Sequence, residues 1–259
     1  MLGASVQAVR RGGSAKAVAI VVLALALACW LVVLQRMRGM DMGPGTDLGS
    51  FPFFLGVWVT MMAAMMLPSA LPMVLLFDRV ARGRRAAGKQ TPTTSIFVAS
   101  YLVVWAGFGI AAFFIYRALR SADWSLLSWH QHGALLAGGA VAAAGLYELT
   151  PLKRACLRHC RSPLHYVLGD WRPGLRGAIL MGAQHGSYCV GCCWGLMLIL
   201  FALGVMSITW MLLVTAVIFV QKVLPWGPVP HRVSALALLG FGVWIAIDPA
   251  SVPGLTLPM

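Results

Sequence analysis

The residues best suited to chemistry are an imidazole and three thiols that lie within nine residues of one another. They are His185, Cys189, Cys192 and Cys193, in the middle of an apolar stretch long enough to cross a bilayer. Polar groups in such a span are costly and by default mark a pathway, a relay or a bound ligand. Thiols beside an imidazole suit copper, zinc or iron, and the softest donors favour Cu(I).

Helix geometry predicts that these donors share one face. At 3.6 residues per turn, Met181, His185, Cys189 and Cys192 fall on one stripe of a helix, with Cys193 just beside it. We therefore predict that the imidazole and the three thiols form half of a metal site. The alternative is that these small cysteines only pack against neighbouring helices, next to glycines that permit close approach.

A second group of donors consists of four methionines on another predicted span: Met61, Met62, Met65 and Met66. Methionines three or four positions apart lie on the same or adjoining helix faces. Pro68 and Pro72 follow, and each leaves a carbonyl without its helical donor. Such a break at membrane depth is tolerated where it lines a buried or hydrated cavity. We predict that these thioethers face the thiols and the imidazole near the centre of the bilayer.

Two further groups are weaker candidates for metal contact. One lies in a glycine-rich exported loop, where it would capture a soft cation: Met40, Asp41 and Met42. The other lies in a predicted cytoplasmic segment: Cys156, His159 and Cys160. Neighbouring Lys and Arg residues there favour thiolates but repel an arriving dication.

Composition indicates an integral membrane protein. Hydrophobic residues make up 60% of the 259 residues and charged residues 10%, whereas soluble domains are about a quarter charged. We predict a single all-α domain over residues 1–259, a polytopic bundle of about seven transmembrane helices. The predicted spans are residues 17–34, 53–77, 95–116, 133–149, 177–203, 207–224 and 233–247, with hydrophilic loops over 78–94 and 153–176.

The distribution of basic residues predicts the orientation. If the N-terminus is cytoplasmic, all but four of the 20 Lys and Arg residues fall in cytoplasmic segments, the exceptions being Arg36, Arg38, Arg117 and Arg120. Cytoplasmic loops accumulate Lys and Arg, so we expect a cytoplasmic N-terminus and an exported C-terminus. The charges lie in short loops that suit anionic lipid, and we expect no nucleic-acid partner.

Four segments together resemble a family of uncharacterised bacterial integral membrane proteins that are predicted to bind metal. They are residues 61–69, 149–157, 185–194 and 221–227, within a resemblance that extends from Met40 to Gly227. It implies a multi-pass protein of the bacterial inner membrane. The family usually has a glutamate where this chain has Gln221 and often an amide where it has Glu148. If these two residues pair, the negative charge has moved from one helix to the other.

Glu148 is the only glutamate in the chain. Its place at the inner end of the fourth predicted span would let it pair with Lys153 or Lys222. We expect a structural ion pair there in preference to a proton relay.

These features predict a non-enzymatic protein that handles a soft metal, most plausibly copper, with zinc or iron as alternatives. Its role would be transport, storage or delivery to a metalloenzyme, with a metalloenzyme or metallochaperone as partner besides the lipid bilayer. No nucleotide-binding signature is present in the sequence. One alternative is a membrane thiol-disulfide oxidoreductase that uses Cys189 and Cys192 with a quinone. Another is an accessory subunit of a larger membrane complex.

Overall fold

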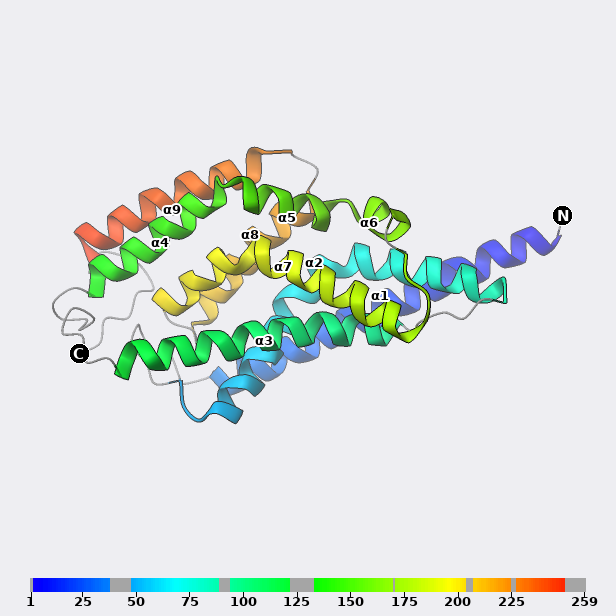
Figure 1. Cartoon of the computed structure of the whole chain (residues 1–259), viewed down its shortest axis with the longest axis horizontal. Helices are drawn as coiled ribbons and strands as arrows, with labels where there is room; N and C mark the ends of the chain where they lie inside the picture. Colours follow the sequence, from blue (N-terminus) through cyan, green and yellow to red (C-terminus); the bar gives the residue numbers. More distant parts are fainter. Residues whose placement is uncertain are drawn as a thin grey trace.

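The computed structural model describes residues 2–37, 48–88, 94–121, 133–169, 171–203, 207–224 and 227–249. Throughout these ranges the regular structure is helical, without a strand (Figure 1). In chain order the helices are α1 (Leu2–Met37), α2 (Phe51–Ala86), α3 (Thr94–Ser121), α4 (Ala134–Glu148), α5 (Pro151–Arg161), α6 (Pro163–Gly169), α7 (Gly174–Leu203), α8 (Ile208–Val223) and α9 (Val229–Ile247).

Each predicted span corresponds to a helix, but not every one is a complete crossing. Five described stretches are long and apolar enough to cross a membrane: Ala15–Met37, Phe51–Ala86, Thr94–Leu119, Gly174–Leu203 and Val229–Ile247. The shorter α4 continues into α5 after a bend of 64°, and the pair together could make a sixth span. The apolar helix α8 has only 16 residues. Large apolar side chains such as Ile20 and Val103 are exposed, so the bundle is compatible with a lipid environment.

The two predicted loops are largely helical, so that expectation was wrong. Helix α2 continues through Asp78, which forms an ion pair with Arg82 one turn later, and ends before Gly88, whose φ is +71°. Helix α5 begins at Pro151 because Thr150 caps it, accepting the backbone N–H of Lys153 at 3.3 Å. The density of basic side chains in these segments concealed their helical pattern.

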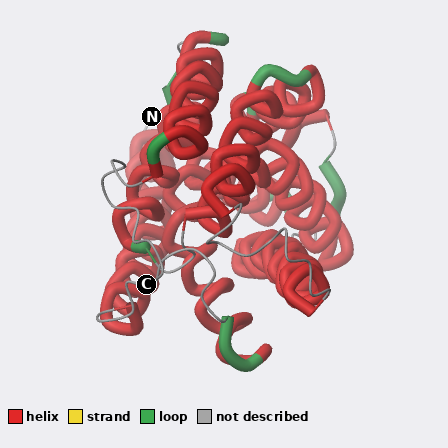
Figure 2. The backbone as a smooth tube through the Cα atoms, turned by 90° about the vertical axis from the view of Figure 1, so that its left-hand side faces the viewer, coloured by secondary structure: helices red, strands yellow, loops and turns green. Residues whose placement is uncertain are grey.

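Helix α7 packs against α3, α4, α5 and α8, and α2 packs against α1, α3, α6 and α8. Among the described residues the backbones of α2 and α7 approach each other at few positions, and α3 and α8 lie against both. Side chains of α2 and α7 still meet: the rings of Trp58 and Phe201 have centroids 5.6 Å apart. Helices α4 and α9 run side by side along one flank of the bundle (Figure 1). Figure 2 shows the bundle turned by 90°, with helices in red and no strand among the described residues. Their backbones meet at Gly138, where an added Cβ would lie 2.4 Å from the carbonyl oxygen of Gly242.

Candidate metal centre

Helix α7 carries the predicted donors on a buried face. His185 is 3% exposed, and Cys189, Cys192 and Cys193 are buried as well. Met181 lies on the same face and is also buried. The stripe predicted from helical periodicity therefore points into the bundle and not towards lipid.

Glycines on α7 let two neighbouring helices approach this face. A Cβ on Gly182 would lie 2.0 Å from Ser100 Oγ and 2.3 Å from the carbonyl oxygen of Phe97, both on α3. A Cβ on Gly191 would lie 2.7 Å from Cys156 Sγ of α5. Small residues permit such close backbone approach between membrane helices. Side chains of α3 and α5 can therefore reach the donors of α7.

Three sulfur atoms form a cluster between α5 and α7. Cys192 Sγ lies 3.3 Å from Cys193 Sγ and 3.8 Å from Cys160 Sγ. The Cys192 thiol also donates to the carbonyl oxygen of Cys189 at 3.2 Å. All of these cysteines are free thiols. The structure thus joins the predicted α7 donors to Cys160, which the sequence suggested only as a weak metal contact.

Cys189 has two partners on other helices. Lys222 Nζ of α8 lies 2.9 Å from Cys189 Sγ, and the hydroxyl of Tyr101 on α3 lies 3.0 Å from it. Lys222 also donates to Ser69 Oγ of α2 at 3.4 Å. Through this one ammonium group, α8 connects α2 with α7.

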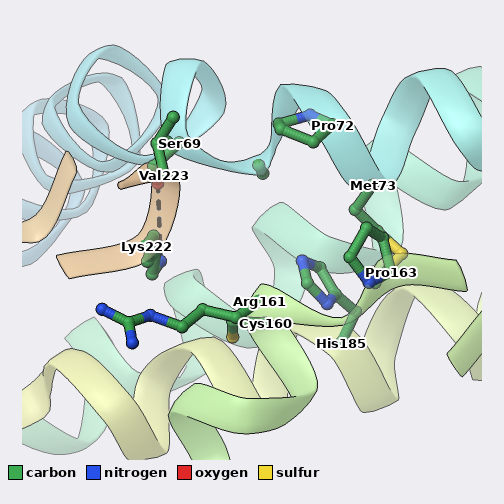
Figure 3. Close-up of a pocket in the computed structure, with 10 residues that line it drawn as sticks. Ser69, Pro72, Met73, Cys160, Arg161, Pro163, His185, Lys222 and Val223 are labelled. Carbon is green, nitrogen blue, oxygen red and sulfur yellow. Dashed lines mark hydrogen bonds between the residues drawn. The ribbon is translucent and has the colours of Figure 1, made fainter. Parts of the chain in front are cut away.

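A cavity of about 120 Å³ adjoins the thiol cluster (Figure 3). Roughly 10–15 Å³ is enough for one water molecule, so the cavity has room for a metal ion. Cys160, His185 and Lys222 reach it from α5, α7 and α8, below the α2 segment that carries Ser69 and Pro72 (Figure 3). Of the two α2 prolines, Pro72 lines this cavity.

The potential ligands at this cavity are a thioether, a thiol and an imidazole, from Met73, Cys160 and His185. Such soft donors suit Cu(I). Within the described ranges, no group of three or more His, Cys, Asp or Glu side chains is arranged to hold a metal ion. A metal site here would therefore depend on the methionine as the third donor, or on rotation of neighbouring cysteine side chains towards the cavity.

The four methionines of the predicted cluster belong to α2, and all are buried in the bundle: Met61, Met62, Met65 and Met66. The α2 methionine at the cavity is Met73, two turns closer to the end of the helix. Few backbone positions of α2 lie close to α7, and the pairing of the four methionines with the α7 donors stays a prediction.

The weaker candidates have separate positions. The ring of His159 stacks on Tyr188 of α7 with centroids 4.1 Å apart, and its Nδ1 lies 2.9 Å from the carbonyl oxygen of Ala155. Cys156 packs over Gly191. The exported candidates lie outside the described residues: Met40, Asp41 and Met42.

Glu148 forms a buried ion pair with Lys153, one of its two predicted partners. Gln221 joins both groups: its Nε2 donates to Glu148 Oε2 at 2.8 Å, and its Oε1 accepts from Lys153 Nζ at 2.9 Å. The network connects α4, α5 and α8. Positions 148 and 221 therefore do pair, as considered from the sequence.

Sequence reasoning missed Ser69, Met73 and Tyr101, and it treated Lys222 only as a partner for Glu148. The sequence did contain a signal for Lys222. It is the only charged residue in α8, and a charge in such an apolar stretch requires a polar partner. No comparable signal marks Tyr101 or Met73, because both residue types are common in apolar cores.

Comparison with known proteins connects the chain with copper. A family model described as PpoB2, copper chaperone, matches residues 55–245, a range that includes every residue named at the cavity. No curated protein and no solved structure matches the chain. The predicted relation to copper is thus supported at the level of the family. Since the match covers most of its length, the chain belongs to the PpoB2 copper chaperone family.

Proposed function

We propose that this protein is a multi-pass protein of the bacterial inner membrane that binds Cu(I) in the cavity between α2, α5, α7 and α8 and delivers it to a copper enzyme. The observation that carries the proposal is that Met73, Cys160 and His185, from three different helices, line one cavity. Thioether and thiol donors favour Cu(I) over harder ions. The family description, a copper chaperone, favours delivery over storage or transport.

The thiols next to the cavity can serve as alternative ligands for the bound ion. Cys192 lies 3.8 Å from Cys160, and Cys193 lies 3.3 Å from Cys192. An ion held at the cavity would therefore have further sulfur ligands within a side-chain rotation. Exchange of one ligand for another at low cost is what a delivery protein needs, because a bound ion must also leave. The sulfur cluster gives Cu(I) such a series of alternative ligands.

Metal analysis of the purified protein tests the proposal. The wild-type protein should bind one Cu(I) in competition with a chromophoric chelator. Cys160→Ser and His185→Ala should each weaken binding by at least about tenfold, because each removes a ligand. Cys29→Ser is the matched control, since Cys29 lies on α1, away from the cavity. Binding that survives both cavity substitutions would show that the site is elsewhere.

A second candidate function is thiol-disulfide exchange, now favoured by a specific contact. The sulfur of Cys192 lies close to that of Cys160 on another helix, so the reactive pair would be Cys160 with Cys192. The sequence had suggested Cys189 with Cys192. Stoichiometric reduction of a quinone by the metal-free dithiol protein would support this function, and its absence in a protein that binds Cu(I) would leave copper delivery.

A further inference from the structure

Lys222 is a buried cation at the cavity, and no carboxylate of the described residues pairs with it. It is 8% exposed, and it contacts the thiol of Cys189 at 2.9 Å and the hydroxyl of Ser69 at 3.4 Å. In the described part of the chain, the ion pairs are Arg82 with Asp78 and Lys153 with Glu148. The Lys222 ammonium is therefore not neutralised by an acidic side chain.

Lys153 provides an internal comparison. It is 1% exposed, more deeply buried than Lys222, but it pairs with Glu148 and donates to Gln221. Its charge is cancelled locally. A buried ammonium without an anion is costly. The presence of Lys222 beside a thiol, at a cost in stability, therefore indicates that it has a function. Even where the Cys189 thiol ionises beside this cation, Lys222 lines the cavity and Cys189 does not, so an ion in the cavity would face the ammonium group and not the thiolate.

The position of Lys222 affects any ion that enters the cavity. Lys222 lines the cavity together with Cys160 and His185, so a bound metal ion would lie close to a fixed positive charge. Arg161 lines the cavity as well, but its guanidinium group donates to the carbonyl oxygens of Gln221 and Gly227. Coulomb repulsion is proportional to the product of the two charges. A dication is therefore repelled twice as strongly as a monocation at the same position, and low polarity around the site strengthens the effect.

We infer that Lys222 makes this cavity selective for a monovalent ion over a divalent one. The inference rests on the proposed function, since it concerns the same cavity. Cu(I) and Zn(II) are a suitable pair of probes because both have a filled d shell and no geometric preference from d electrons. They differ chiefly by one unit of charge. Soft donors favour Cu(I) over Zn(II) whether or not Lys222 is present. Lys222 increases this selectivity through a repulsion that depends only on the charge of the ion.

Binding of Cu(I) and Zn(II) to the wild-type protein, Lys222→Leu and Lys222→Arg tests the inference. Lys222→Leu removes the charge and adds no sulfur that could itself bind Cu(I). It should raise the affinity for both ions, and the logarithm of the gain for Zn(II) should be about twice that for Cu(I), for example about 100-fold against about tenfold. Lys222→Arg keeps the charge and should preserve the wild-type ratio within a few-fold. Equal gains for the two ions, or a gain for Cu(I) alone, would overturn the inference.

A second measurement does not depend on the folding of a variant. Ag(I) and Cd(II) are another soft, filled-shell pair that differ by one charge. The wild-type protein should bind Ag(I) more tightly, and tighter binding of Cd(II) would overturn the inference. Failure of the proposed function is distinguishable from these results. It would appear as Cu(I) binding that is absent or insensitive to Cys160→Ser and His185→Ala. The inference alone fails if binding depends on both residues but Lys222→Leu leaves the Zn(II) to Cu(I) ratio unchanged.

Discussion

Cys160 Sγ and Cys192 Sγ lie 3.8 Å apart, although the two residues belong to different helices and are separated by 32 positions. A disulfide needs the sulfurs to approach to about 2.0 Å, which is a small movement from this arrangement. We therefore predict that Cys160 and Cys192 are the cysteines that form a disulfide.

Mild oxidation of the metal-free protein with diamide should link Cys160 to Cys192. Peptide mapping by mass spectrometry should find this cross-link, and it should disappear in Cys160→Ser but persist in Cys156→Ser. Prior loading with Cu(I) should slow its formation, because a bound ion would engage the same sulfurs. A dominant bond between Cys189 and Cys192 would contradict the prediction and agree with the pairing suggested by sequence spacing.

The two groups of methionines on α2 can be separated by one matched pair of substitutions. Met73→Leu should weaken Cu(I) binding by at least about tenfold, since even residues that only support metal ligands change affinity by roughly 10–100-fold. Met65→Leu should leave binding within a few-fold of wild type. Both changes replace a buried methionine with a residue of similar volume. If Met65→Leu has the larger effect in chelator competition, the mid-membrane methionine site predicted from the sequence is the better description.

Gly182 should be intolerant of even a methyl group. In Gly182→Ala the new Cβ would lie 2.0 Å from Ser100 Oγ and 2.3 Å from the carbonyl oxygen of Phe97, so α3 and α7 must separate. Overpacking of this kind costs about 1–3 kcal/mol, and the apparent melting temperature in detergent should fall. Gly107→Ala on α3 is the control, because a Cβ there meets nothing within 4 Å. Equal stability of the two variants would show that α3 and α7 are not packed so closely.

The Glu148 network predicts a rescue by exchange of charge. Glu148→Gln leaves the Lys153 ammonium buried without a carboxylate, which destabilises by about 3–5 kcal/mol. Adding Gln221→Glu should recover most of this loss, because Gln221 Oε1 already accepts from Lys153 Nζ at 2.9 Å. The melting temperature and the yield of monodisperse protein measure both effects. A double variant no more stable than the single one would show that the two positions are not equivalent partners for Lys153.

The sequence predicted well those features that depend on one helix. The helical class, the position of each apolar span and the buried stripe of His185, Cys189 and Cys192 all follow from hydropathy and from 3.6-residue periodicity. The ion pair of Glu148 with Lys153 was also accessible, because the two residues are close in the chain and a lone glutamate in an apolar protein needs a cation.

Features that depend on the arrangement of several helices could not be predicted from the sequence. Periodicity places Met73 and Met65 on buried faces of α2, but it cannot tell which of them lies beside α7. Cys160 reaches the α7 thiols only because the chain bends by 64° between α4 and α5. The sequence marks a break at Pro151, but neither the size nor the direction of the bend can be read from it.

The same bend has a mechanical consequence for the release of a bound ion. Cys160 is carried on α5, a helix of 11 residues that departs from the direction of α4, so its thiol approaches the cavity from the side. If the cavity holds Cu(I) as proposed, a tilt of α5 would withdraw one sulfur while the thioether of Met73 and the imidazole of His185 stay where they are. Release of the ion would then need the movement of one short helix and not of the long ones.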